Sequence, residues 1–115
     1  MITEPTSPGP DPRTINEFEP PIPPGEVLGH EFMVRVNIGP TALARAMHVP
    51  VNRITDILAG KRRITARTAL LLATHFETSP EFWMRLQTDY DLRLARRDRF
   101  RRSQLQTMRN TTRPP

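Results

Sequence analysis

Apolar residues recur at intervals of three and four through the middle of the chain, which is the periodicity of helices that bury one face. Stop and start residues divide this region and predict helices over residues 24–36, 40–47, 51–59, 66–76 and 80–94. The positions predicted to face inward are Val27, Leu28, Phe32, Val36, Leu43, Ala44, Met47, Val51, Ile54, Ile57, Leu58, Ala66, Ala69, Leu70, Ala73, Phe76, Phe82, Trp83, Leu86 and Tyr90.

The predicted helix boundaries carry residues with known preferences for helix ends. Pro40 and Pro80 stand at first helical positions, where the missing N–H is not needed. Gly60 follows the third helix at the place that favours a left-handed residue, and Thr65 is the predicted cap of the fourth helix. The pattern therefore predicts an all-α domain of five helices.

Composition separates three segments. Of the 115 residues 13 are Pro, and most of these lie in residues 1–23, a segment that we predict to be extended or disordered because it holds few large apolar side chains. Residues 24–95 form the predicted domain. In the tail, residues 96–115, seven Arg and one Asp give a net charge of +6, and the pattern leaves open a solvated helix or disorder.

Composition also argues against several classes of function. The chain has no Cys, which rules out a disulfide scaffold, a thiol nucleophile and a Cys-ligated metal. No apolar run approaches the roughly 20 residues of a membrane span, and the N-terminus lacks the pattern of a signal peptide, so we expect a cytoplasmic protein. His30, His48 and His75 lie far apart in the sequence. We therefore expect no metal, no cofactor and no catalytic site.

The second and third predicted helices are joined by about three residues, which is the layout of a helix-turn-helix. In such a motif the second helix enters the major groove of DNA, where Arg reads guanine, Asn reads adenine and Thr contacts a base or a thymine methyl. An acidic side chain there accepts from cytosine or positions an Arg. The predicted base-reading residues are Asn52, Arg53, Thr55 and Asp56.

A run of three cations, Lys61, Arg62 and Arg63, follows directly after the third helix. Cations at this place would contact phosphates and supply sequence-independent affinity, and Thr41 and Arg45 on the second helix would add to them. The alternative interpretation is that these residues form a solvated loop without a partner. For the basic tail, the two interpretations are an anionic partner, or a solvated segment whose arginine content reflects the base composition of the genome.

Three stretches resemble the HigA/VapI family of antitoxins: residues 49–65 (VPVNRITDILAGKRRIT), residues 78–87 (TSPEFWMRLQ) and residues 23–28 (PPGEVL) with Glu31-Phe32 following. They occur in the order and spacing of the family and cover roughly residues 23–95. The resemblance implies an XRE-type, lambda-repressor-like helix-turn-helix fold. It also implies a homodimer that binds double-stranded operator DNA, represses its own operon and neutralises a HigB-type toxin, a RelE-like ribonuclease.

The chain departs from the family pattern at two places. Gly39 and Pro40 stand where the family often has Thr-Gln or Ser-Gln, so one expected phosphate contact is missing. Arg67 replaces the acidic residue that is usual near the start of the fourth helix. Two alternatives therefore stay open: a plain XRE-type regulator without a toxin, and a protein-interaction module that has lost DNA binding.

Two further surfaces are predicted. The fifth helix, through Phe82, Trp83, Leu86 and Tyr90, is expected to form either the dimer contact or part of the core. The acidic N-terminal arm, with Phe18 and Ile22 as apolar anchors, is expected to bind the basic surface of the toxin.

Overall fold

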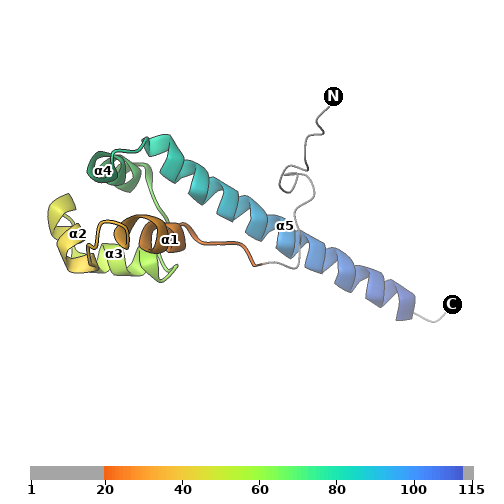
Figure 1. The fold of residues 1–115 in the computed structure, drawn as a ribbon. Helices are drawn as coiled ribbons and strands as arrows, with labels where there is room; N and C mark the ends of the chain where they lie inside the picture. Colours follow the sequence, from red (N-terminus) through yellow and green to blue (C-terminus); the bar gives the residue numbers. More distant parts are fainter. Residues whose placement is uncertain (1–19, 113–115) are drawn as a thin grey trace, which may run out of the picture. The chain divides into compact units, whose positions relative to one another are not determined.

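The computed structural model of the chain describes residues 20–112, with side chains as far as Arg109, and this part of the chain contains helices and no strand. The all-α class and the five α-helices are confirmed. The elements in chain order are α1 (Pro24–Val27), the π-helical stretch η2 (Leu28–Met33), α2 (Pro40–Met47), α3 (Val51–Leu58), α4 (Ala66–Phe76) and α5 (Pro80–Thr112) (Figure 1).

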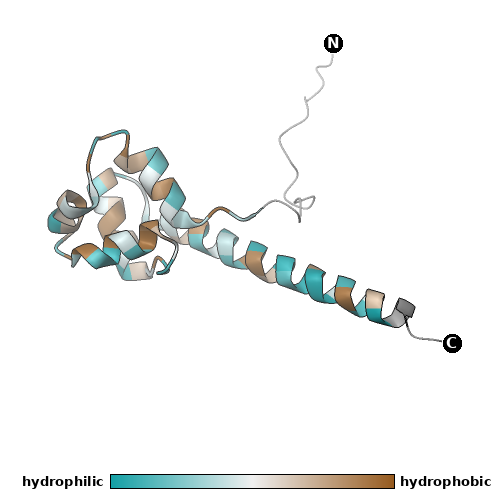
Figure 2. Cartoon of the chain, turned by 90° about the horizontal axis from the view of Figure 1, so that it is seen from below, coloured by the Kyte–Doolittle hydropathy of each residue, from teal (hydrophilic) through white to brown (hydrophobic). Residues whose placement is uncertain are grey.

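The chain divides into two compact units, of which one is the helical domain Pro21–Ala95. Residues 96–112 belong to the second unit, and there they continue α5 as a helix rather than as a disordered tail. Figure 2 shows that this part of α5 is mostly hydrophilic with isolated hydrophobic residues. Phe18, one of the two predicted toxin anchors, lies outside the described residues. None of the described helices combines the length and the apolar character needed to cross a membrane.

The core of the helical domain is formed by residues of η2, α2, α3, α4 and α5 together with Ile64, and Trp83 of α5 is its largest fully buried side chain. The indole Nε1 of Trp83 donates to Thr78 Oγ1 at 2.7 Å, and Phe32 packs against the indole with ring centroids 4.9 Å apart. The buried apolar residues are Leu28, Met33, Leu43, Ala44, Met47, Ile54, Ile57, Ile64, Ala69, Leu72, Ala73 and Trp83.

The π-helical stretch changes which residues of the first predicted helix face inward. The N–H of Val34 donates to Gly29 O at 3.1 Å, which is an i→i−5 bond. Such a turn holds one residue more than an α-turn and rotates the following side chains by about 100°. Met33 therefore packs inward, and the predicted inward position of Val36 is wrong because that side chain is 57% exposed. The helical stretch ends at Asn37, which is left-handed with φ 54°, and Ile38 then packs against the core while its N–H donates to Met33 O at 3.0 Å.

Three more inward predictions are wrong, because Val51, Ala66 and Leu70 are exposed. Ala66 is the first residue of α4. Val51 is 44% exposed because it is the first residue of α3 and extends past the edge of the core. On α4 the buried stripe runs through Ala69, Leu72 and Ala73, and Leu70, about 100° away around the helix, is 58% exposed. The apolar run of α4 offers several stripes of helical spacing, and the sequence does not distinguish them.

The predicted caps are confirmed. Gly60 has a positive φ of 75°, and Thr65 Oγ1 accepts from the N–H of Thr68. Ser79 Oγ accepts from the N–H of Phe82 at 3.1 Å at the start of α5. At Gly25 the close packing of two helices requires a glycine. A Cβ there would lie 1.9 Å from the carbonyl oxygen of Ile57, so only Gly lets α1 pack this closely on α3.

Candidate nucleic-acid interface

The helices α2 and α3 pack against each other and form a helix-turn-helix. Leu43, Ala44 and Met47 are buried on α2, and Ile54 and Ile57 are buried on α3. The chain turns between the helices at His48, which is left-handed with φ 57°, and Pro50 then precedes α3 in an extended conformation. This tight turn fixes the direction of α3 and determines which of its residues face solvent.

The outer face of α3 carries the four residues predicted to read bases. Asn52 and Thr55 are exposed, whereas Arg53 and Asp56 are half-buried. The hydroxyl of Thr55 donates to the backbone oxygen of Asn52 at 3.3 Å, so toward a base it offers its lone pairs and methyl group. Arg53 has its Nε buried without a hydrogen-bond partner among the described residues. Its partial burial restricts the side chain and lowers the entropy lost when the guanidinium binds a partner.

The basic loop, residues 61–63, is folded back on the end of α3. The backbone oxygen of Asp56 accepts from the N–H of Lys61 at 2.8 Å and from the N–H of Arg62 at 3.2 Å. Both side chains are exposed. The loop therefore presents its first two cations at the C-terminal end of α3 in a position fixed by backbone hydrogen bonds.

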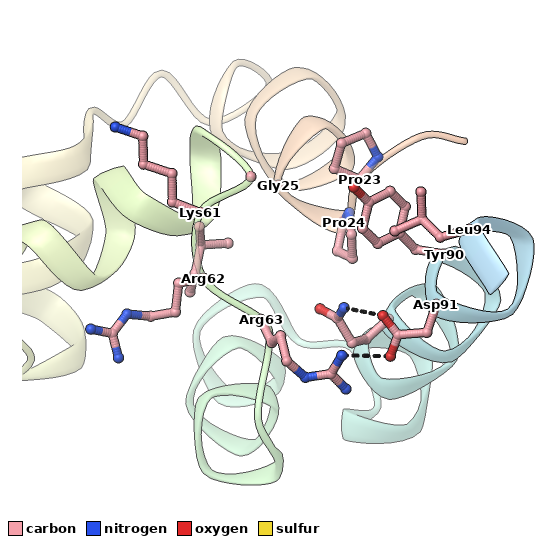
Figure 3. Close-up of a pocket in the computed structure, with 12 residues that line it drawn as sticks. Pro23, Pro24, Gly25, Lys61, Arg62, Arg63, Tyr90, Asp91 and Leu94 are labelled. Atoms are coloured by element: carbon pink, nitrogen blue, oxygen red, sulfur yellow. Dashed lines mark hydrogen bonds and ion pairs between the residues drawn. The ribbon is translucent and has the colours of Figure 1, made fainter. Parts of the chain in front are cut away.

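The third cation of the loop is held by α5 instead. Nη1 of Arg63 lies 2.6 Å from Oδ2 of Asp91. Oδ1 of Asp91 accepts from Nε2 of Gln87 at 3.1 Å, and Oε1 of the same amide accepts from the backbone N–H of Ile64 at 2.8 Å. In Figure 3 Arg63 turns toward Asp91, while Lys61 and Arg62 point the other way. The carboxylate neutralises one of the three cations and ties the loop to α5.

Gln87 and Asp91 were missed by sequence reasoning, although a signal was present. Gln87 is 3% exposed and stands four residues after Trp83 on the inner stripe of α5. A polar residue on an otherwise apolar stripe indicates a buried group that needs hydrogen-bond partners. Asp91, four residues further on, is one of those partners, and the backbone N–H of Ile64, directly after the basic loop, is the other.

The remaining predicted site residues lie on α2 and α5. Thr41 and Arg45 are exposed on α2, one turn apart on the face opposite its buried stripe. The predicted seam of α5 faces the core of its own chain: Trp83 is fully buried, and Phe82 and Leu86 pack against the core. Of the two alternatives for Trp83, the structure therefore supports the core and not the dimer contact.

Tyr90 of α5 and Ile22, which precedes α1, are the two remaining predicted site residues that the structure describes. Tyr90 lines a cavity of about 290 Å³ that Pro23, Pro24 and the basic loop also line. Ile22 is 59% exposed. No group of three or more His, Asp or Glu side chains within residues 20–112 is placed to hold a metal ion.

A helix-turn-helix family model matches residues 37–83. Virulence-associated protein I of Dichelobacter nodosus is 41% identical over 80 residues, which cover 70% of this chain and 74% of that protein. The structure of the Pseudomonas aeruginosa antitoxin HigA with the higBA promoter is similar with a TM-score of 0.64 and 45% identity, over 65% of this chain and 82% of that one. An addiction module antidote protein of a HigA family from Coxiella burnetii is 38% identical with a TM-score of 0.65, over 84% of this chain and 100% of that one.

Proposed function

Because the chain belongs to the HigA family of XRE-type helix-turn-helix antitoxins, we propose that it binds operator DNA as a dimer, represses its own operon and neutralises a RelE-type ribonuclease toxin. The observation that carries the DNA-binding part is the outer face of α3. Its polar side chains Asn52, Arg53 and Thr55 stand beside the fixed cations Lys61 and Arg62. Base-reading groups next to phosphate-binding groups are what a recognition helix requires.

The dimer contact proposed here is an apolar groove between α4 and α5 rather than the inner stripe of α5. The groove has a volume of about 480 Å³, and Leu70, 58% exposed, lies in it together with Ala66 and Met84. Arg85 and Asp89 also line the groove, one helical turn apart on α5. In a two-fold dimer the same patch of each chain faces the other. The Arg of this pair in one chain can therefore lie opposite the Asp of its partner, and the reverse.

The toxin partner follows from the family, and the proposed contact is the acidic arm. Ile22 is exposed directly before α1, and a basic RNA-binding toxin would attract the carboxylates that precede it. Gly39 favours one alternative, a module without DNA binding, because α2 begins there with no side-chain cap and no side chain long enough to reach a phosphate. The cations at Arg45, Lys61 and Arg62 are proposed to compensate.

Two measurements test this function. Fluorescence anisotropy with the promoter DNA of its own operon and with random DNA of equal length should show a large preference for the promoter. Co-expression with the adjacent toxin gene should restore growth and give a complex that co-purifies. Equal binding to both DNAs would exclude the repressor function and favour the protein-interaction module. Growth arrest despite soluble protein would exclude the antitoxin function and favour the plain regulator.

A further inference from the structure

The part of α5 in the second unit carries an unusual concentration of positive charge. Residues 96–102 contain five Arg and one Asp, and each of these Arg has another three or four residues away along the helix. Like charges at these spacings destabilise a helix, because the side chains are neighbours on its surface. No ion pair to a carboxylate is found for these Arg within the described residues. An anionic partner would relieve this repulsion and stabilise the helix.

The same chain supplies a segment of opposite charge. Residues 1–19 hold four acidic residues and one Arg, a net charge of −3, together with apolar residues such as Ile15 and Phe18. The helix offers exposed apolar side chains between its arginines, among them Leu94, 37% exposed, and Leu105, 56% exposed. These two stand eleven residues apart, which is three helical turns, so they share one face of α5 with Arg101.

The residues of the helical domain that adjoin the two segments line the same cavity. Pro23, which follows the acidic segment, and Leu94, which precedes the arginines, line one cavity of the helical domain. From there residues 96–109 rise by about 20 Å along the helix. A 19-residue segment spans up to about 60 Å when extended, so it can follow this whole stretch. Exposed ion pairs are individually weak, but a short tether gives an effective concentration of about 1 mM.

We propose that residues 1–19 bind along the arginine-rich face of residues 96–109 of the same chain and compete with DNA phosphates for these arginines. The acidic segment thereby lowers binding to random DNA and leaves operator recognition to α3. This contact goes beyond the proposed repressor and antitoxin function, and its test uses neither the operator nor the toxin. A basic toxin would compete with the tail for the same carboxylates.

A spin label tests the contact directly, because the chain has no Cys and one introduced Cys is the only attachment point. In full-length Ser7→Cys protein, the label should broaden amide NMR signals of residues 97–108 and leave Asn52 on α3 unchanged. The broadening should vanish at 1 M salt, where the Debye length is about 3 Å. It should also vanish in an arm-neutral variant that combines Glu4→Gln, Asp11→Asn, Glu17→Gln and Glu19→Gln.

Binding to random DNA tests the consequence. The arm-neutral variant should bind about tenfold more tightly at 0.1 M salt, with a salt slope steeper by about 2–3 units if three arginines are released. The matched control, Arg13→Gln, makes the segment more acidic and should weaken binding. Absence of broadening at low salt would overturn the proposal, as would broadening that persists in the arm-neutral variant. Broadening seen only between labelled and unlabelled chains would also overturn it, since the contact would then join two molecules.

Discussion

Replacing the buried amide of Gln87 by the similarly shaped Met tests whether this side chain holds the basic loop on α5. The substitution keeps most of the volume and removes both hydrogen bonds, so the N–H of the buried Ile64 loses its partner at 2.8 Å. A buried donor left unpaired costs about 1–3 kcal/mol. In a domain of this size each kcal/mol lowers Tm by about 4–8 °C, so a loss near 2 kcal/mol lowers it by about 8–16 °C.

The assay is urea unfolding followed by the fluorescence of Trp83, the only Trp in the chain. The midpoint should fall while the slope m stays the same, because the surface exposed on unfolding is unchanged. Asp91→Asn is the matched control: it keeps an oxygen for the amide of Gln87 and removes only the charge that faces Arg63. That ion pair is largely exposed, with side chains 64% and 36% accessible, so its loss should cost less than about 1 kcal/mol. Equal losses for the two variants, or none for Gln87→Met, would show that the amide of Gln87 does not hold the loop.

Three further sets of substitutions test the core, the phosphate contacts and the dimer contact separately. Trp83→Ala should cost about 3–5 kcal/mol, because it empties the largest buried site and leaves Thr78 without its donor, and calorimetry should show partial or complete unfolding. Lys61→Gln and Arg62→Gln should weaken operator and random DNA alike and lower the salt slope by about 0.9 for each phosphate that is no longer neutralised, as read from anisotropy titrations; weakening confined to the operator would contradict this role. Leu70→Lys should leave the circular dichroism unchanged and convert the dimer to a monomer in sedimentation, because it puts a charge into the apolar groove; a stable dimer would exclude this groove.

Much of the fold was predictable because local signals agreed with each other. The helix ends carried residues with specific roles, such as Gly60 at a positive φ and the capping hydroxyls of Thr65 and Ser79. The helix-turn-helix followed from two short amphipathic helices and a tight link. The outward face of α3 was visible because Ile54 and Ile57 define its inner stripe.

The errors have a common physical origin. The π-helical stretch η2 has no local signature in the sequence, and it shifts the inner face of this helix so that Met33 is buried and Val36 is exposed. On α4 several apolar stripes compete, and tertiary packing selects the one through Leu72. The close approach at Gly25 likewise depends on a helix far away in the sequence.

The side chains of the interface were predictable from the sequence, but the contacts that join the basic loop to α5 were not. The cations at Lys61, Arg62 and Arg63 were recognised as one run, but only the fold shows that Arg63 is paired with a carboxylate from α5. An ion pair between residues 28 positions apart leaves no pattern in the sequence. Gln87 was missed as well, although its polar side chain on an apolar stripe was a readable signal.

The most direct test of the central claim, that α3 reads the operator, is a comparison of operator and random DNA affinity for Asn52→Ala and Arg53→Ala. We expect a loss of about 1–3 kcal/mol on the operator and little change on random DNA, because base contacts carry specificity. Arg67→Ala, which removes an exposed cation at the start of α4, is the matched control and should leave the ratio of the two affinities unchanged. Equal losses on both DNAs for the α3 variants would contradict base readout by this helix.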